Sequence, residues 1–115
     1  MKTILMIDDD ELILESMKVV FTDLGYDITT ISQPAEGIIT ATTRDFDLIL
    51  TDVRMPGING SEVVYKIREA KPKAKVLVVT AYPGDPWAQK ALDFGALALV
   101  KKPFEIVKIL DFLKD

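Results

Sequence analysis

The chain has 115 residues, of which 49% are hydrophobic and 28% are charged, and this balance is typical of one globular domain spanning residues 1–115. The formal net charge of −4 argues against direct binding of nucleic acid by this domain, because such binding needs a basic face. Cysteine and histidine are both absent, which excludes disulfides, thiolate nucleophiles, imidazole bases and zinc sites built from these residues.

Residues 3–7, TILMI, form the first expected strand. Acids follow this short apolar run where a signal peptide would carry small residues. No apolar run in the sequence approaches the roughly 20 residues of a membrane helix. We therefore expect a strand buried on both faces, in a cytoplasmic protein without a membrane segment.

A helix, an edge strand and a second helix are expected next. The first helix ends at Gly25, and its inner stripe is expected at Ile13, Met17, Val20, Phe21 and Leu24. Residues 26–32, YDITTIS, are more polar, as is usual at the edge of a sheet. Pro34 can open the second helix, whose expected apolar anchors are Ile38 and Ile39.

The middle of the chain predicts two buried strands with a helix between them. Residues 47–52, DLILTD, end at Asp52, and residues 75–81, KVLVVTA, end near Thr80. The loop after Asp52 carries the turn formers Pro56, Gly57, Asn59 and Gly60. The helix that follows this loop is marked by Val63, Val64 and Ile67.

The last part of the chain predicts a helix, a strand and a final helix. Asp85 is a candidate N-cap of the fourth helix and Pro86 its first residue, and Gly95 ends that helix. Residues 96–100, ALALV, are the fifth expected strand. The final helix has its inner stripe at Ile106, Ile109, Leu110 and Leu113.

Five alternations of strand and helix indicate an α/β domain with a doubly wound, five-stranded parallel sheet and helices on both faces. In such sheets ligands bind beyond the carboxyl ends of the strands. Polar residues lie at four of these ends, namely Asp8 to Asp10, Asp52, Thr80 and Lys102. They are therefore expected to converge on one edge of the sheet.

The chemistry of this set points to a phosphoryl group and a metal ion. Several carboxylates in one place repel each other unless a cation or a proton intervenes, and hard oxygen ligands suit Mg²⁺. Lys102 would neutralise charge and the Thr80 hydroxyl would donate a hydrogen bond. Each residue taken alone has a plain structural interpretation, since three acids can be a solvated turn and Lys-Pro a loop. Their joint occurrence favours an aspartyl-phosphate site.

With these motifs in place, the sequence resembles the receiver domains of bacterial two-component response regulators over essentially its whole length. The motifs are ILMIDDDE, DLILTDVRMPGINGSEV, VLVVTAY and GALALVKKPF, in the order and spacing of that family. The resemblance implies a flavodoxin-like fold with strand order 2-1-3-4-5. It also implies a phosphorylation-dependent switch that helps its own phosphorylation and slowly hydrolyses the product, and that is not a metabolic enzyme.

The resemblance assigns a role to each motif residue. Asp52 would accept the phosphoryl group from the phosphohistidine of a sensor histidine kinase or phosphotransfer protein. Mg²⁺ (or Mn²⁺) would be held by Asp9 and Asp52, by the backbone carbonyl of Arg54, and by Asp8 through water. The remaining matches are the switch hydroxyl of Thr80, the small Ala81, Lys102 and a cis-proline candidate at Pro103. Asp10 matches no ligand, so we interpret it as the cap of the first helix.

Two features depart from the family pattern. The position three residues before Lys102 usually holds Tyr or Phe, but here it is Leu99, so the aromatic part of the switch is in question. Tyr82 could supply a moving ring instead. The loop YPGDPW at residues 82–87 contains two prolines, which should make its response stiffer. Arg54 and Tyr82 occupy positions that influence the lifetime of the phosphorylated state in this family.

Two surfaces are candidates for partners. Leu12 and Val19 are spaced to share a face of the first helix with Glu15 and Ser16. This strip, with the loop after Lys102, is a candidate kinase-docking patch, although extra packing would explain the two apolar residues equally well. Phosphorylation is expected to shift the surface of the fourth helix, fifth strand and fifth helix toward an output partner or domain. That surface would include Trp87, Leu99 and Phe112, and a phosphorylation-dependent homodimer is left open.

Two other interpretations of the sequence compete with this one. Some Mg²⁺-dependent phosphatases also begin with a DxD pair, here Asp8 and Asp10, with Asp8 as the nucleophile. Such enzymes usually need a longer chain with a cap that excludes water. A scaffold that is never phosphorylated is the other alternative. The sequence leaves open the kinase, the output, and whether the domain stands alone or was cut from a longer regulator.

Overall fold

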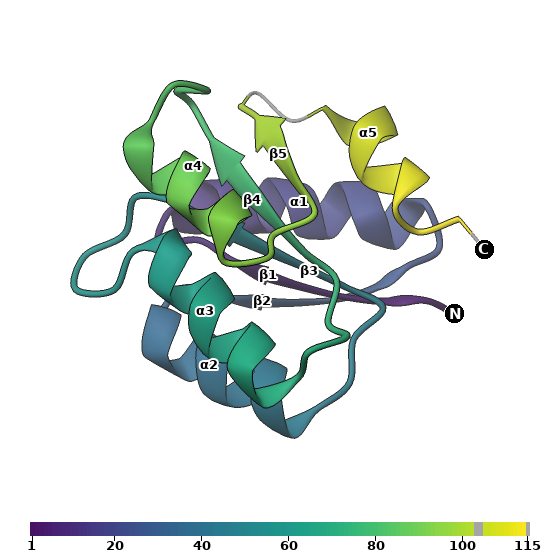
Figure 1. Cartoon of the computed structure of the whole chain (residues 1–115). Helices are drawn as coiled ribbons and strands as arrows, with labels where there is room; N and C mark the ends of the chain where they lie inside the picture. Colours follow the sequence, from purple (N-terminus) through teal and green to yellow (C-terminus); the bar gives the residue numbers. More distant parts are fainter. Residues whose placement is uncertain (103–104, 115) are drawn as a thin grey trace.

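The computed structural model describes residues 1–102 and 105–114 (Figure 1). Five strands alternate with five helices in this part of the chain, as the sequence predicts. The elements are β1 Thr3–Ile7, α1 Glu11–Asp23, β2 Asp27–Ile31, α2 Pro34–Thr43, β3 Leu48–Asp52, α3 Gly60–Ala70, β4 Val76–Thr80, α4 Pro86–Asp93, β5 Ala98–Lys101 and α5 Ile106–Asp111. The cis-proline candidate Pro103 lies outside the described residues.

All five strands are parallel and lie in the order β2-β1-β3-β4-β5, which confirms the expected topology and the edge position of β2. The pairing register brings the strand ends together. Thr51 lies opposite Ile7, Asp52 opposite Val79, and Thr80 opposite Lys101. The residues that close β1, β3, β4 and β5 therefore share one edge of the sheet.

Helices cover both faces of this sheet (Figure 1). Side chains alternate along each strand, so Ile4 and Met6 of β1 pack on the face of α1 and α5, while Leu5 and Ile7 pack on the face of α2, α3 and α4. The interior strands are buried on both faces, which explains their continuous apolar sequences. Within the part of the chain that the structure describes, every helix is too short or too polar to cross a membrane.

The inner stripe of α1 differs from the sequence prediction. Leu14, Met17 and Phe21 are buried at spacings of three and four residues, whereas Val20 is 36% exposed and Leu24 49% exposed. The predicted stripe and the observed stripe both fit an amphipathic helix, because apolar residues flank Met17 and Phe21 on each side of the helix. The helix turns its Leu14 side to the sheet, and Leu24 lies at the C-cap.

The anchors predicted for α2 are also only partly correct. Ile38 packs against the core but Ile39 is 62% exposed, and the buried residues are Pro34, Gly37 and Ala41. A Cβ added at Gly37 would lie 2.6 Å from the Cδ1 atom of Ile7. Small residues thus allow α2 to approach β1 closely. Hydrophobic periodicity does not predict this, because it registers large apolar side chains and not small ones.

The predicted helix starts and the last strand are confirmed with small shifts. Asp85 caps α4 and Pro86 is its first residue, while Gly95 follows the helix with a φ of +111°. In α5, Ile109 is buried and Ile106 and Leu110 pack against the same core, whereas Leu113 is buried two residues beyond the end of the helix. The last strand is Ala98–Lys101, so it begins two residues later than expected and Lys102 comes directly after it.

The orientation of α1 gives a first prediction. Leu14→Ala should lower the free energy of unfolding by roughly 2–5 kcal/mol, because it opens a cavity under α1. The matched variant Leu24→Ala should cost less than about 1 kcal/mol, because half of that side chain is already in water. Urea unfolding of both variants measures the difference, and equal losses would contradict the orientation described here.

Candidate functional site

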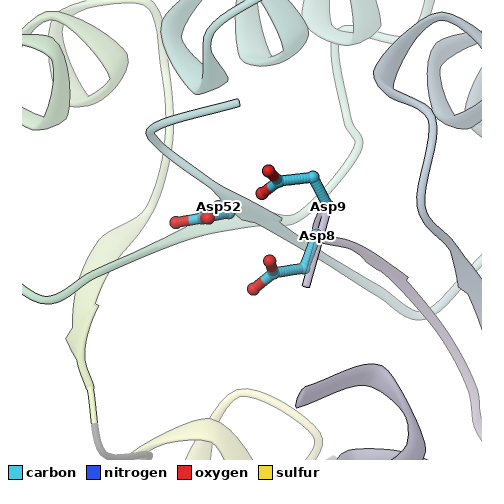
Figure 2. Close-up of side chains that lie close together, drawn as sticks. All are labelled: Asp8, Asp9 and Asp52. Carbon is cyan, nitrogen blue, oxygen red and sulfur yellow. The ribbon is translucent and has the colours of Figure 1, made fainter. Parts of the chain in front are cut away.

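Three carboxylates converge where β1 and β3 end. Asp8 and Asp9 follow β1, and Asp52 is the last residue of β3. Asp8 is fully buried and Asp52 is 8% exposed, whereas Asp9 is exposed. One carboxylate oxygen from each of the three lies within 4.8 Å of the others, and Figure 2 shows their side chains projecting into the same space. The convergence predicted from the strand ends is confirmed for these residues.

The three consecutive acids after β1 have different local roles. Asp8 turns inward, and its Oδ1 accepts a hydrogen bond of 2.9 Å from the backbone N–H of Asp10. Asp10 caps α1, since its Oδ1 accepts from the N–H groups of Leu12 and Ile13 at 3.0 and 3.3 Å. This confirms the interpretation of Asp10 as a helix cap. Only Asp8 and Asp9 of this run contribute to the acidic cluster.

Lys102 reaches the two buried carboxylates together. Its Nζ lies 3.1 Å from Asp8 Oδ2 and 3.4 Å from Asp52 Oδ2. The backbone N–H of Lys102 donates to the carbonyl of Thr80 at 2.8 Å, which ties the residue to the end of β4. The side chain is only 19% exposed, so on folding carboxylate oxygens replace much of the water around Lys102. The predicted meeting of lysine and acids is thus confirmed.

Burial and neighbouring charges both change the pKa values of Asp52 and Lys102. Burial, followed by the nearby Asp8 carboxylate, raises the pKa of Asp52 to about 6, although Lys102 and the N–H of Val53 favour its ionised form. Burial alone would favour the neutral amine of Lys102, but the charges of Asp52 and Asp8 outweigh it and raise the pKa of Lys102. At neutral pH Asp52 is therefore mostly ionised and Lys102 is protonated.

The donor set fits a hard divalent cation. Mg²⁺ prefers carboxylate oxygens, and each of the three acids offers one such oxygen within 4.8 Å of the others. Bringing Asp8, Asp9 and Asp52 so close favours a bound cation, because like charges repel. These residues fit Mg²⁺ or Mn²⁺, whereas the contribution of the Arg54 carbonyl stays a prediction.

Thr80 lies at the same edge, but its hydroxyl is engaged locally. The side chain is buried at the end of β4, and its Oγ1 donates to the carbonyl of Tyr82 at 3.2 Å and accepts from the N–H of Tyr82 at 3.0 Å. Ala81, which follows, is exposed and small. To reach a group attached to Asp52, the Thr80 hydroxyl must give up at least one of its bonds to Tyr82.

The loop after Asp52 depends on Gly60 for a reason that the sequence did not indicate. Gly57 has a φ of +84° and is a true turn former, but Gly60 begins α3 without a positive φ. A Cβ at Gly60 would press on the carbonyl of Asp52 and lie 2.8 Å from the Cα of Val53. The backbone N–H of Gly60 donates to the Val53 carbonyl at 2.8 Å. Because Gly60 has no side chain, the start of α3 can pack directly against the end of β3.

A contact between Arg54 and Asp85 was not anticipated. Arg54 Nε lies 2.7 Å from Asp85 Oδ2, and Nη2 lies 2.9 Å from Oδ1, so the pair is bidentate. The guanidinium group of Arg54 lowers the pKa of Asp85. A local sequence pattern cannot predict a pair between residues 31 positions apart, and the sequence identified Asp85 only as the N-cap of the fourth helix.

The candidate partner surfaces differ in exposure. Leu12 is 75% and Val19 62% exposed on α1, and Glu15 and Ser16 are also exposed, so the docking strip faces solvent. Leu99 and Trp87 are half-buried against the core of the α2, α3 and α4 face, whereas Phe112 packs against the core on the other face. Tyr82 is 72% exposed. Whether these residues meet partners stays a prediction.

Sequence comparison with known proteins agrees with this geometry. The family described as the response regulator receiver domain matches residues 4–114. A response regulator receiver protein of Anaeromyxobacter sp. (strain Fw109-5) is 33% identical over 111 residues, which is 96% of this chain and 47% of that protein. The chain therefore spans about half the length of the curated relatives that it matches first.

Solved structures show the same fold. A CheY-like receiver domain protein of Methanospirillum hungatei JF-1 superimposes with a TM-score of 0.89 at 30% identity, over 98% of this chain and 90% of that one. The response regulator TrrA of Thermotoga maritima, solved with Mg²⁺ and BeF, gives 0.83 at 32% identity, over 98% and 96% of the two chains. The likeness covers the whole sheet and its helices.

The raised pKa of Asp52 gives a second prediction. The folded state holds this proton more tightly than the unfolded chain, whose carboxyl titrates near 3.8, so Asp52 increasingly destabilises the fold as pH rises from about 4 to about 6. Asp52→Asn should therefore be more stable than wild type at pH 8 by on the order of 1–2 kcal/mol, with little difference below pH 4. Urea unfolding in chelator at pH 4, 6 and 8 measures this. A gap independent of pH would contradict the assignment.

Proposed function

Because the chain belongs to the family of response regulator receiver domains, we propose that it is a phosphorylation-dependent switch of a two-component system, with Asp52 as the phosphoacceptor. One observation carries the proposal. Asp52 ends the central strand beside Asp8 and Asp9, and Lys102 Nζ lies 3.4 Å from its Oδ2. In this proposal Asp52 is the nucleophile, Asp8 and Asp9 help to hold the metal ion, and Lys102 is the cation that an aspartyl phosphate needs.

The proposed transfer starts from the phosphohistidine of a partner kinase or phosphotransfer protein. An ionised oxygen of Asp52 attacks phosphorus, a P–O bond forms, and the P–N bond breaks with its electron pair returning to the imidazole. Mg²⁺ held by Asp9, Asp52 and the Arg54 carbonyl, and by Asp8 through water, would neutralise the charge on the phosphoryl oxygens. Lys102 already contacts an Asp52 oxygen and can stay paired with the anion during the transfer.

Phosphorylation would then shift a population of conformations. The phosphoryl group adds about −1.5 to −2 charges at Asp52. Thr80 can donate to it only after its hydroxyl leaves the Tyr82 carbonyl, which frees that carbonyl of one of its hydrogen bonds. Because residues 81–85 connect Thr80 to the start of α4, this change would alter the surface of α4, β5 and α5. Leu99 takes the place of the usual aromatic residue on that surface, so the readout there need not involve a ring.

The domain is proposed as a signalling protein whose chemistry is confined to its own aspartate. Its output would be a partner or an additional domain, since the matched relatives are about twice as long as this chain. A phosphorylation-dependent homodimer belongs to the same set of proposals. The cytoplasmic location predicted from the sequence stays a prediction, as do the absence of nucleic-acid binding and the absence of metabolic enzyme activity.

The phosphoacceptor assignment is tested with acetyl phosphate in the presence and absence of Mg²⁺. Intact-mass analysis should show one phosphoryl group on wild type with Mg²⁺, and none on Asp52→Asn, because the nucleophile is lost. Asp8→Asn is the matched variant, and it should label weakly because it removes part of the metal site. Labelling that survives in Asp52→Asn but disappears in Asp8→Asn would instead support a phosphatase with Asp8 as nucleophile. No labelling of wild type would leave a binding scaffold.

The docking strip on α1 gives a separate prediction. Alanine at both Leu12 and Val19 should slow transfer from a phosphorylated histidine kinase domain, while labelling by acetyl phosphate stays unchanged. Both side chains are mostly in water, so the double variant should fold normally. Rates with the two donors, measured side by side, provide the control. Equal loss with both donors would reject the docking role and point to a structural defect.

A further inference from the structure

The segment from Thr80 to Asp85 is a compact hydrogen-bonded unit that links the switch hydroxyl to the start of α4. The Tyr82 carbonyl accepts from the Thr80 hydroxyl at 3.2 Å and from the N–H of Asp85 at 2.9 Å. Asp85 in turn accepts from the N–H of Trp87 at 2.9 Å, in the first turn of α4. Tyr82 thus connects the Thr80 hydroxyl with Asp85, the residue that caps α4.

Arg54 anchors this unit from the other side of the phosphorylation site. It lies two residues after Asp52, and its guanidinium group makes the bidentate pair with Asp85. The Asp85 side chain is only 2% exposed, whereas that of Arg54 is 62% exposed. The carboxylate is therefore almost fully removed from water and depends on Arg54 and the Trp87 N–H for compensation. Movement of Asp85 away from Arg54 would leave a buried charge short of partners.

The hydrogen bonds of Thr80 show which arrangement this anchor favours. In the structure the Thr80 hydroxyl is satisfied by Tyr82 rather than directed to a group on Asp52. The Arg54–Asp85 pair holds Asp85, and through it Tyr82, in this same arrangement. A contact that is stronger in one of two conformations shifts the population toward that conformation and weakens any ligand that selects the other.

We propose that Arg54 is a positioning residue whose ion pair with Asp85 opposes the phosphorylation switch by holding the Thr80–Asp85 segment and the start of α4 in the resting arrangement. This inference rests on the proposed phosphoacceptor function of Asp52. It assigns to the side chain of Arg54 a role separate from that of its backbone carbonyl. Arg54 thereby connects the loop that follows the phosphoacceptor with the helix of the output surface.

Two conservative variants break the pair from opposite sides. Arg54→Gln removes the guanidinium group but leaves the backbone carbonyl in place. Asp85→Asn removes the charge but keeps an effective N-cap for α4. Arg44→Gln is the matched control, because Arg44 lies at the C-cap of α2 and packs over Phe46. Thermal unfolding verifies that each variant folds, and either variant alone is sufficient for the test.

The experiment titrates the full chain with beryllofluoride at fixed Mg²⁺ and follows the fluorescence of Trp87, the single tryptophan. Both Arg54→Gln and Asp85→Asn should bind the analogue about three- to tenfold more tightly than wild type, the range expected for losing one partly exposed charge-assisted contact. The double variant should gain no more than either single variant, because each removes the same contact. Arg44→Gln should bind as wild type does.

The signs of the two effects separate this proposal from simple electrostatics. If only the charge near the anion mattered, Arg54→Gln would bind the analogue more weakly and Asp85→Asn more tightly. Opposite signs, or affinities equal to wild type in both variants, would overturn the proposal. A wild-type protein that does not respond to beryllofluoride with Mg²⁺ would instead overturn the phosphoacceptor function itself, so the two failures are distinguishable.

Hydrogen exchange without metal or analogue gives an independent measurement. In Arg54→Gln the amides of Asp85 and Trp87 should exchange several-fold faster than in wild type, because their segment has lost its anchor. Amides of β1 and β3 in the same sample serve as the internal reference. Unchanged exchange at Asp85 and Trp87 would contradict the anchoring role even if the affinities changed.

Discussion

The site depends on one electrostatic constraint, which is that two buried carboxylates lie side by side with a single ammonium group between them. Asp8 and Asp52 would repel each other, and Lys102 compensates both within 3.1 and 3.4 Å. Burial and the Asp8 carboxylate together still raise the pKa of Asp52 to about 6, although Lys102 favours its ionised form. Three carboxylates beside one ammonium group favour the binding of a divalent cation, and such binding competes with protons for the same oxygens.

Backbone contacts in the rest of the fold hold the charged residues of the site in place. Lys102 is tied to Thr80 through its backbone, and Gly60 allows α3 to pack against the carbonyl of Asp52. The parallel register places these attachments at one edge of the sheet, so little conformational entropy remains to be lost when charges meet there. By contrast, the Thr80 hydroxyl is held by two hydrogen bonds to the neighbouring Tyr82 and not by the acidic cluster.

Much of this arrangement was predictable from the sequence, because alternating strands and helices leave few topologies, and parallel strands bring their carboxyl ends together. Asp8, Asp9, Asp52, Thr80 and Lys102 all lie at that edge as predicted. The orientation of α1 was not predictable, since apolar residues flank Met17 and Phe21 on both sides. Nor was the closeness of α2, which depends on Gly37, or the Arg54–Asp85 pair, since a contact between distant loops is decided by packing and not by local pattern.

Asp85 serves both as the cap of α4 and as the partner of Arg54, and these two duties constrain how the protein can evolve. Ser, Thr and Asn are adequate helix caps, yet none of them carries the charge that matches a guanidinium group. Drift at position 85 toward another capping residue would leave α4 intact while changing the balance between its two arrangements. Positions 54 and 85 are therefore expected to covary among relatives, and substitutions there offer a route to regulators of different sensitivity built on an unchanged scaffold.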